Sequence, residues 1–344
     1  MSDTAADQPR ALGYLDRVKN SSHPTTPRAL VVDSEGRTLL DTGDTSLPLA
    51  LTGVTKLFTL AMVLREIDRG ALTLDTPLGD VLPADIVRGL CVVHGEDHSF
   101  SVTIEHLVRH QSGIVDYMRP GRAHLRPLVQ QFLDHDRAWS LDQALEIAKH
   151  YPGLNRPGST SKAQYSSTNY LLLGAVLQDT TGMRFEDLIR LRVVGSLGLE
   201  NTYVYGPDYY DKYFTLSPIH RGSQVVRIPQ ALASSGADGA IVSTPKDSLT
   251  FLRAFWRGDL FHESWIPQLT QRTLACDASP RMGLGVMVRP SRWGKSLAVG
   301  HSGISGVAIA VEPRTGRYGC VTTSQWSPLA SGFENVTGLL REVT

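Results

Sequence analysis

The sequence has little cysteine and no excess of charge of either sign. Three cysteines occur among 344 residues, and none forms a C-x-x-C pair: Cys91, Cys276 and Cys320. An odd, sparse count argues against a disulfide framework and a zinc ribbon, so we expect buried free thiols. The 34 basic and 34 acidic residues cancel. Without a basic field to hold a phosphate backbone, nucleic acid is a poor candidate partner.

Long apolar runs are also lacking. No window approaches about 18 uninterrupted apolar residues, the length that a membrane-spanning helix needs. The first nine residues are polar and acidic, without the basic and apolar regions of a secretory signal. We therefore expect no membrane partner and a cytoplasmic location. With 41% hydrophobic and 20% charged residues, the chain has the composition of a globular protein with a substantial core.

Strand-like segments occur at both ends of the chain. Residues 1–9 are expected to form a loose tail, followed by a short helix at Ala11–Lys19. Two β-like runs, Ala29–Asp33 and Arg37–Asp41, flank the turn Ser34-Glu-Gly36, which indicates a hairpin. Near the other end, short segments rich in β-branched or small residues predict further strands, and a helix follows them: residues 283–289, 297–300, 307–311 and 318–323, then 333–342.

Apolar residues at helical intervals predict helices in the middle of the chain and in residues 54–69, which precede it. Apolar residues recur at helical intervals through Val54–Arg69. Thr244 precedes Pro245 as a capping residue of a helix that runs through Trp256. Other helices are predicted at residues 103–110, 141–150, 168–180 and 185–194. We therefore predict an α+β fold. Residues 10–75 and 235–344 form an antiparallel sheet region flanked by helices, and residues 76–234 form an inserted, mostly helical region of one interleaved unit.

The segment from Leu51 to Thr59 opens the strongest predicted helix. Lys56 follows Gly53 by three residues, so the two positions lie on one helix face, a turn apart. A nucleophile at position 53 would sit at a helix N-terminus, where unpaired amides favour negative charge on an attacked carbonyl oxygen. A lysine whose pKa is depressed by burial could accept the nucleophile's proton. Alone, G-x-x-K is more simply a solvated lysine on a helix.

Two other segments carry residue types suited to catalysis. Tyr165 ends a loop and leads into a helix, where it could act as a phenolate-like base if a cation lowers its pKa. The simpler reading is a half-buried tyrosine with a hydrogen-bonded hydroxyl. The run Val299-Gly-His-Ser-Gly-Ile-Ser-Gly306 lies between two strand-like segments. There the amide of Ile304 could be an oxyanion donor, and His301 could place a donor or positive charge near a substrate. A structural histidine is the alternative.

The order of these segments resembles one family of enzymes. G-x-x-K at 53–56, Tyr-Ser-Ser at 165–167 and His-Ser-Gly at 301–303 are similar to the S-x-x-K, Y-x-N and K-T-G motifs of the serine β-lactamase and penicillin-binding-protein superfamily. The match is with its class C β-lactamase, DD-peptidase and esterase branch. Residues 104–114 and 236–247 look like that branch's L-L-x-H-x-S-G-L and G-G-L-x-S-T-x-x-D stretches. The resemblance covers the chain from about Arg28 to its C-terminus and implies a β-lactamase/transpeptidase-like fold.

The resemblance implies a role for each matching residue. The family's nucleophile falls on Gly53, its lysine on Lys56 and its tyrosine base on Tyr165. Its strand motif falls on His301, Ser302 and Gly303, a variant of the esterase and peptidase branches. Its oxyanion hole would use the amides of residues 53 and 304, and its substrate-binding asparagine falls on Ser167. Together, the expected catalytic and substrate-binding positions are Gly53, Lys56, Tyr165 and His301, with Ser167, Ser302, Gly303 and Ile304.

Two departures from the family pattern bear on activity. Glycine has no atom that can form an acyl-enzyme, and Ser167 shortens or removes a contact to a substrate amide. With His301 in place of lysine, the second change weakens the case for β-lactam hydrolysis. Ser46 and Ser112 lie outside the motif and are not expected to replace the nucleophile. The survival of Lys56 in register favours a serine enzyme in which glycine was introduced deliberately; the alternative is a natural relative that lost its nucleophile.

The resulting expectation is a serine-type hydrolase or acyltransferase, inactive or strongly impaired in this form. Its substrate would be a small ester or amide, with water, an amine or an alcohol as acyl acceptor, as in an esterase, an amide hydrolase or a tailoring transacylase of secondary metabolism. The alternative is a non-catalytic binding or sensor protein with the same pocket. Metal catalysis through His94-Gly-Glu-Asp-His98 is a third idea, but the run lies in a polar stretch without a further defined ligand. We expect no metal and no cofactor.

Overall fold

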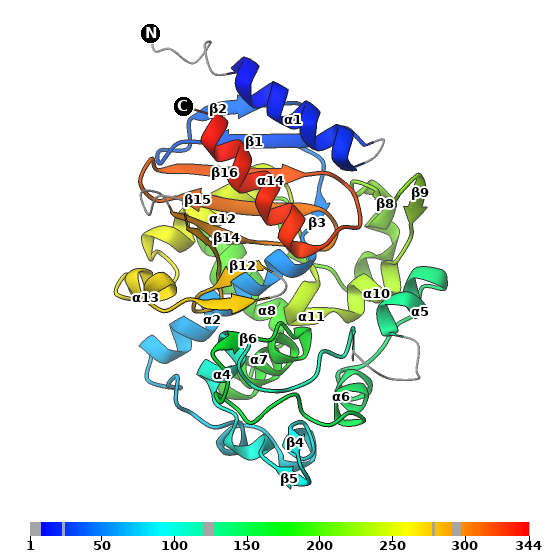
Figure 1. The fold of residues 1–344 in the computed structure, drawn as a ribbon, viewed down its shortest axis with the longest axis vertical. Helices are drawn as coiled ribbons and strands as arrows, with labels where there is room; N and C mark the ends of the chain where they lie inside the picture. Colours follow the sequence, from blue (N-terminus) through cyan, green and yellow to red (C-terminus); the bar gives the residue numbers. More distant parts are fainter. Residues whose placement is uncertain (1–7, 23–24, 120–126, 277–278, 291–296, 344) are drawn as a thin grey trace.

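A nine-stranded sheet joins the two ends of the chain (Figure 1). The computed structural model describes residues 8–22, 25–119, 127–276, 279–290 and 297–343. The N-terminal hairpin pairs with the last strand, in a register running from Arg28 opposite Thr322 to Val32 opposite Tyr318. The strand order is β2-β1-β16-β15-β14-β13-β12-β11-β6. The bounds are β1 Arg28–Val32, β2 Thr38–Asp41, β6 Lys162–Ala163, β11 Leu274–Cys276, β12 Ser279–Met282, β13 Met287–Pro290, β14 Leu297–Ser302, β15 Val307–Glu312 and β16 Arg317–Thr322.

The sheet is antiparallel except at one edge, where β6 from the helical region pairs in parallel with β11. This arrangement confirms the predicted α+β class and the sheet built from both chain ends. The strand expected at residues 283–289 is present only in its second half, as part of β13. Residues 283–286 are instead a turn between β12 and β13, in which the Gly283 amide donates to the Val286 carbonyl at 2.8 Å. Gly285 adopts a φ of 70° there, a conformation that glycine allows without strain.

Helices cover both faces of the sheet. α14 (Leu329–Glu342) packs on β14, β15 and β16, and α1 (Gln8–Ser22) lies over α14, whereas α12 (Pro245–Arg257) packs on the opposite face against β1, β15 and β16. α1 contains the expected helix 11–19 and begins at Gln8; residues 1–7 of the expected tail lie outside the described residues. Thr244 caps α12 by accepting the Asp247 amide at 3.2 Å, as the sequence predicted.

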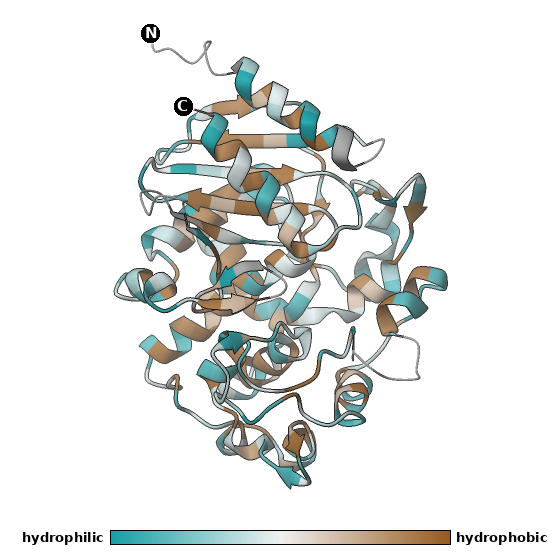
Figure 2. Ribbon diagram, viewed as in Figure 1, coloured by the Kyte–Doolittle hydropathy of each residue, from teal (hydrophilic) through white to brown (hydrophobic). Residues whose placement is uncertain are grey.

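The central helices form because their apolar residues are buried on nearly every side. α2 (Thr55–Asp68) packs against α7 (Ser167–Thr181), in the main core cluster. Phe58 of α2 stacks on Phe251 of α12 with ring centroids 3.5 Å apart, which ties α2 to the helix that covers this face of the sheet. Figure 2 shows the apolar strands of the sheet and the more polar outer helices. The core thereby fixes the start of α2, where the motif residues lie.

The remaining elements build the inserted region and its connections. The helices expected at 103–110, 141–150 and 185–194 are present with shorter or divided bounds. The bounds are β3 Leu49–Ala50, η1 Thr52–Val54, η2 Leu78–Asp80, α3 Ala84–Val87, β4 Val92–Val93, β5 Glu96–Asp97, η3 Ser99–Ser101, α4 Ile104–Val108, α5 Leu128–Asp134, α6 Leu141–Lys149, α8 Phe185–Ile189, the π-helix η4 Arg190–Val194, α9 Gly195–Leu197, β7 Tyr203–Val204, η5 Pro207–Thr215, β8 Ile219–Arg221, β9 Gln224–Val226, α10 Pro229–Ser234, α11 Gly236–Gly239, β10 Ile241–Ser243 and α13 Trp265–Gln271.

Candidate active site

The start of α2 is a tight turn that places position 53 against the main sheet. β3 ends at Ala50, and Thr52 follows with a φ of 43°, a left-handed conformation that is costly for a β-branched residue. The Thr52 hydroxyl lies 3.1 Å from the Ser305 hydroxyl, which in turn donates to the Ala50 carbonyl at 2.7 Å. These bonds hold the strained turn against the loop between β14 and β15. Such strain is typical of functional sites.

Gly53 lies in close contact with the end of β14. A Cβ atom built on Gly53 would lie 2.5 Å from the Ser302 carbonyl oxygen and 3.4 Å from the Tyr165 hydroxyl. The first contact is too short for any side chain unless backbone moves. The second places the tyrosine hydroxyl next to the position where the family carries its nucleophile. Glycine at position 53 therefore supplies no nucleophile. Its lack of a side chain is also what allows this close packing.

Lys56 lies one turn further along α2, with its side chain only 2% exposed. Its ammonium donates a 2.8 Å hydrogen bond to the backbone carbonyl of Asp238 and lies 3.9 Å from the carboxylate oxygen Oδ2 of the same residue. The ammonium also lies 5.3 Å from the centroid of the Tyr165 ring. Burial lowers the pKa of Lys56, and the carboxylates of Asp238 and Asp116 oppose that effect. The net effect lowers the pKa of Lys56 below its ordinary value of 10.5.

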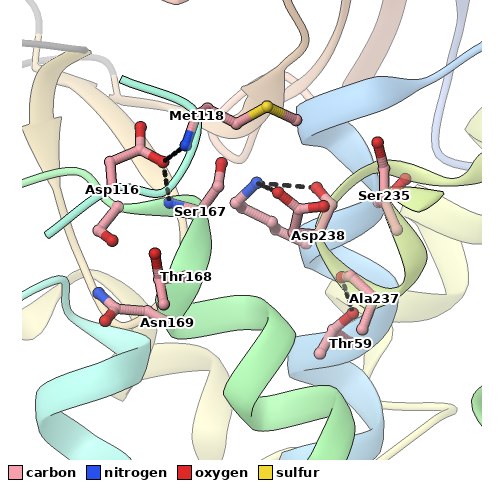
Figure 3. A network of polar contacts seen from close by, with 12 residues as sticks. Thr59, Asp116, Met118, Ser167, Thr168, Asn169, Ser235, Ala237 and Asp238 are labelled. Carbon is pink, nitrogen blue, oxygen red and sulfur yellow. Dashed lines mark hydrogen bonds and ion pairs between the residues drawn. The ribbon is translucent and has the colours of Figure 1, made fainter. Parts of the chain in front are cut away.

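Two aspartates that the sequence analysis did not select, Asp238 and Asp116, interact electrostatically with this lysine. Figure 3 shows both with the polar groups near them. Asp238 of α11 is 3% exposed, and the Ser167 and Tyr117 hydroxyls bond to its carboxylate. Asp116 accepts the amides of Met118 at 3.1 Å and Ser167 at 3.3 Å. Burial raises the pKa of Asp238 to about 6 and also raises the pKa of Asp116. One sequence feature could have pointed to them: each is a single acidic residue within a segment of otherwise small or apolar residues.

Tyr165 joins Lys56 and His301 in one neighbourhood, as the motif order required. The Tyr165 and His301 rings have centroids 6.3 Å apart, and His110 stacks on the other side of Tyr165 at 4.5 Å. Burial raises the pKa of Tyr165 well above its ordinary value, and Asp238 and Asp116 raise it further. The phenol therefore holds its proton at neutral pH.

His301 lies behind the cavity, fully buried in β14. Its Nδ1 is 3.0 Å from the Ser302 amide, and its Nε2 has no hydrogen-bond partner among the residues that the structure describes. Burial and the nearby Lys56 lower the pKa of His301 to about 3. The histidine is thus neutral in the physiological range and supplies no positive charge to a ligand.

This charge state can be measured directly. We expect the ring carbon shift of His301 in ¹³C-histidine-labelled protein to stay constant between pH 5 and pH 8, because the ring titrates near pH 3. The signal is assigned by its loss in His301→Gln. An inflection near the free-imidazole value of about 6.5 would show instead that the imidazole is charged at the site.

A cavity of about 480 Å³ opens beside Gly53 and Lys56. Its polar floor also includes Asp116, Tyr165 and Ser167. Apolar side chains form much of its wall: Val115, Met118, Val129, Phe132, Leu154, Ile228, Leu232, Trp326 and Leu329. A small molecule that carries both polar and apolar groups matches this lining.

The expected strand motif contributes unevenly to the cavity. Ile304 lines it, and its amide has no hydrogen-bond partner among the described residues, so this N–H is free to act as an oxyanion donor. The Ser302 hydroxyl instead donates to the Leu329 carbonyl at 2.6 Å. Gly303 packs against Thr52 so closely that no side chain fits there. Ser302 and Gly303 therefore shape the strand end, and Ile304 lines the cavity.

The other residues considered from the sequence serve structural roles. Ser112 donates to Asn169 at 2.7 Å, and exposed Ser46 donates to Asp44 at 2.9 Å. In the His94–His98 run, Glu96 pairs with Arg156 at 2.7 Å. Of the three cysteines, Cys91 and Cys320 are buried and Cys276 is partly exposed. Among the described residues, no helix combines the length and apolar character needed to cross a membrane.

Comparison with known proteins shows the family. The Beta-lactamase family model matches residues 48–341, so the chain belongs to this family. The D-alanyl-D-alanine-carboxypeptidase/endopeptidase AmpH of Escherichia coli K12 is 24% identical over 262 residues, which cover 73% of this chain and 62% of AmpH. The chain spans 34% to 62% of the length of the curated relatives that it matches.

Solved structures share the fold over nearly the whole chain. A D-stereospecific amidohydrolase from Streptomyces sp. superposes with a TM-score of 0.77 and 22% identity, covering 97% of this chain and 98% of that one. EstCE1, described as a hydrolase with promiscuous acyltransferase activity, gives a TM-score of 0.76 and 18% identity, covering 98% and 99%. At these identities the similarity shows the β-lactamase/transpeptidase-like fold.

Proposed function

We propose that the chain carries the framework of a serine acyl-transfer enzyme for small amides or esters, present here without its nucleophile. The observation that carries the proposal is that three groups lie close to position 53. They are Lys56 one turn away, the Tyr165 hydroxyl, and a strand end with the free Ile304 amide. In the serine-bearing form, the hydroxyl attacks the carbonyl carbon and its proton passes to Lys56. The amides of residues 53 and 304 stabilise the negative oxygen.

The cavity supports a small substrate with an apolar portion. Phe132, Leu232 and Trp326 offer an apolar wall, and the floor offers hydrogen-bonding groups for an amide or ester. The names of similar structures describe an amidohydrolase, a D-amino acid amidase and a hydrolase with acyltransferase activity. We therefore propose that the acyl group would pass to water, an amine or an alcohol. The cytoplasmic location and a place in secondary metabolism remain predictions.

A second candidate function is a binding or sensor protein that uses the same cavity. The close approach of the Ser302 carbonyl to Gly53 favours it, because a site that recently held serine would need room for a Cβ atom there. On this account glycine is natural, and a bound amide or ester stays intact. The deliberately introduced glycine expected from the surviving motif residues is the competing account.

Mass spectrometry of a restored serine form separates these accounts. The Gly53→Ser protein is incubated at pH 9 to 10 with activated esters, amino acid amides and β-lactams, and its intact mass is recorded. We expect a mass increase equal to one acyl group for an ester or amide, which identifies the acyl donor. Noncovalent binding of the same compounds by both proteins, without any mass increase, would support the binding protein instead.

A further inference from the structure

The surroundings of Lys56 differ from those that a proton-accepting lysine needs. Its ammonium donates to the Asp238 carbonyl at 2.8 Å and lies 3.9 Å from the Asp238 carboxylate, with both side chains 2–3% exposed. A carboxylate at this distance in a buried site strongly favours the charged form of lysine. A general base requires an unshared electron pair on nitrogen, and an ammonium has none.

Asp238 is itself held in place by other groups. The Tyr117 hydroxyl lies 3.4 Å from one carboxylate oxygen and 3.5 Å from the other, and the Ser167 hydroxyl also bonds to Asp238. α11, which carries Asp238, packs against both α2 and α7. The carboxylate therefore cannot turn away from Lys56 without breaking a buried network, and such networks fix a single arrangement.

We infer that Asp238 is a positioning residue that keeps Lys56 as an ammonium, and so forms a second barrier to acyl-enzyme formation, independent of Gly53. The inference rests on the proposed function, because it concerns the step in which Lys56 would accept the proton. In that step a serine oxygen would bond to the acyl carbon while its proton moves to the lysine nitrogen. With the Asp238 charge present, the nitrogen already carries that proton.

Other groups around Lys56 do not replace this effect. Tyr165 and Tyr170 face the ammonium with ring centroids at 5.3 and 5.5 Å, and both are protonated phenols at neutral pH. His110 and His301 are buried and neutral, since burial and Lys56 lower the pKa of each. Asp116 is the second carboxylate acting on Lys56, and its Oδ1 oxygen is occupied by two backbone amides. Asp238 is accordingly the stronger partner, and Asp116 is the matched control.

The first measurement uses the chain as it exists. The chain has seven lysines, so ¹³C-lysine labelling gives few signals, and Lys56→Arg assigns the signal of Lys56. We expect Asp238→Asn, which keeps the size and hydrogen-bonding capacity of the side chain, to lower the titration midpoint of Lys56 by about 1–3 pH units. Asp116→Asn should lower it by less. An unchanged midpoint in Asp238→Asn would overturn the inference.

The second measurement follows covalent labelling of serine-bearing variants by a fluorophosphonate between pH 6 and pH 10. At pH 7.5 we expect Gly53→Ser/Asp238→Asn to be labelled at least about tenfold faster than Gly53→Ser, because each pH unit of midpoint shift changes the neutral fraction of lysine tenfold. The two rates should converge near pH 10. Gly53→Ser/Asp116→Asn should stay closer to Gly53→Ser.

The outcomes distinguish the inference from the proposed function. Equal rates in the two serine variants at every pH would overturn the role of Asp238 and leave the serine framework supported. Complete absence of labelling in folded proteins, checked by circular dichroism, would overturn the serine framework. The lysine titration needs no serine, so it tests the effect of Asp238 on the charge of Lys56 whether or not the serine variants are labelled.

Discussion

Gly53→Ser is expected to become labelled by a fluorophosphonate with one phosphonyl group per chain at pH 9 to 10, whereas the unsubstituted protein gains none. The new hydroxyl would lie next to the Tyr165 hydroxyl and one turn from Lys56, at the start of α2. For scale, removing the serine of subtilisin costs roughly 10⁶ in kcat, a value established for that enzyme. A gain in labelling rate of several orders of magnitude is the corresponding expectation here. Intact mass and peptide mapping of residue 53 measure it.

The matched control for this substitution is Gly53→Ala. Alanine introduces the same Cβ atom, which would lie 2.5 Å from the Ser302 carbonyl, but no hydroxyl. Both variants must displace the end of β14, and we expect each to lose about 1–3 kcal/mol of unfolding free energy, the usual cost of overpacking. Gly53→Ser/Lys56→Ala tests the lysine. Labelling of Gly53→Ala, or equal labelling with and without Lys56, would contradict a serine framework served by that lysine.

The motif order predicted much of this site through its resemblance to a known family, which implies that residues 53, 56, 165 and 301–304 share one site. Helical spacing alone predicted that Gly53 and Lys56 lie a turn apart on one helix face. The helical spacing of residues 54–69 likewise predicted α2 because its burial follows from its apolar pattern. These features follow from periodicities that short segments encode.

The two aspartates could not be predicted in the same way. Asp116 and Asp238 are separated by more than a hundred residues, and only the packing of α11 on α2 and α7 brings Asp238 to Lys56. The position of the Ser302 carbonyl also depends on the strained turn at Thr52, which no propensity specifies. The β12–β13 turn was missed because residues 283–289 have strand-like composition, which holds for Met287–Arg289 of β13 but is overridden by two glycines in residues 283–286. Tertiary contacts, not local pattern, determine the charge state of the site.

Lys56→Met is expected to destabilise the fold by about 3–5 kcal/mol at pH 8, the usual cost of removing one partner of a buried ion pair. Methionine keeps most of the volume of the buried stem, so packing changes little, but the Asp238 carboxylate loses its cation and the Asp238 carbonyl loses a donor. Urea unfolding measured by circular dichroism gives the free energy of each protein. A loss below about 1 kcal/mol would show that the pair contributes little to stability.

The pH dependence identifies Asp238 as the source of that cost. The folded pKa of Asp238, about 6, exceeds its ordinary value of 3.8, so between these values the folded chain binds more protons than the unfolded chain. Asp238 therefore lowers stability as pH rises from about 4 to about 6. Since Lys56 lowers the pKa of Asp238, removing Lys56 extends this pH range upward.

We expect the loss of unfolding free energy in Lys56→Met to be smaller at pH 5 than at pH 8. Adding Asp238→Asn should remove most of that difference between the two pH values, because the carboxylate that titrates is then absent. A loss of unfolding free energy that is the same at both pH values would instead assign the effect of Lys56→Met to packing.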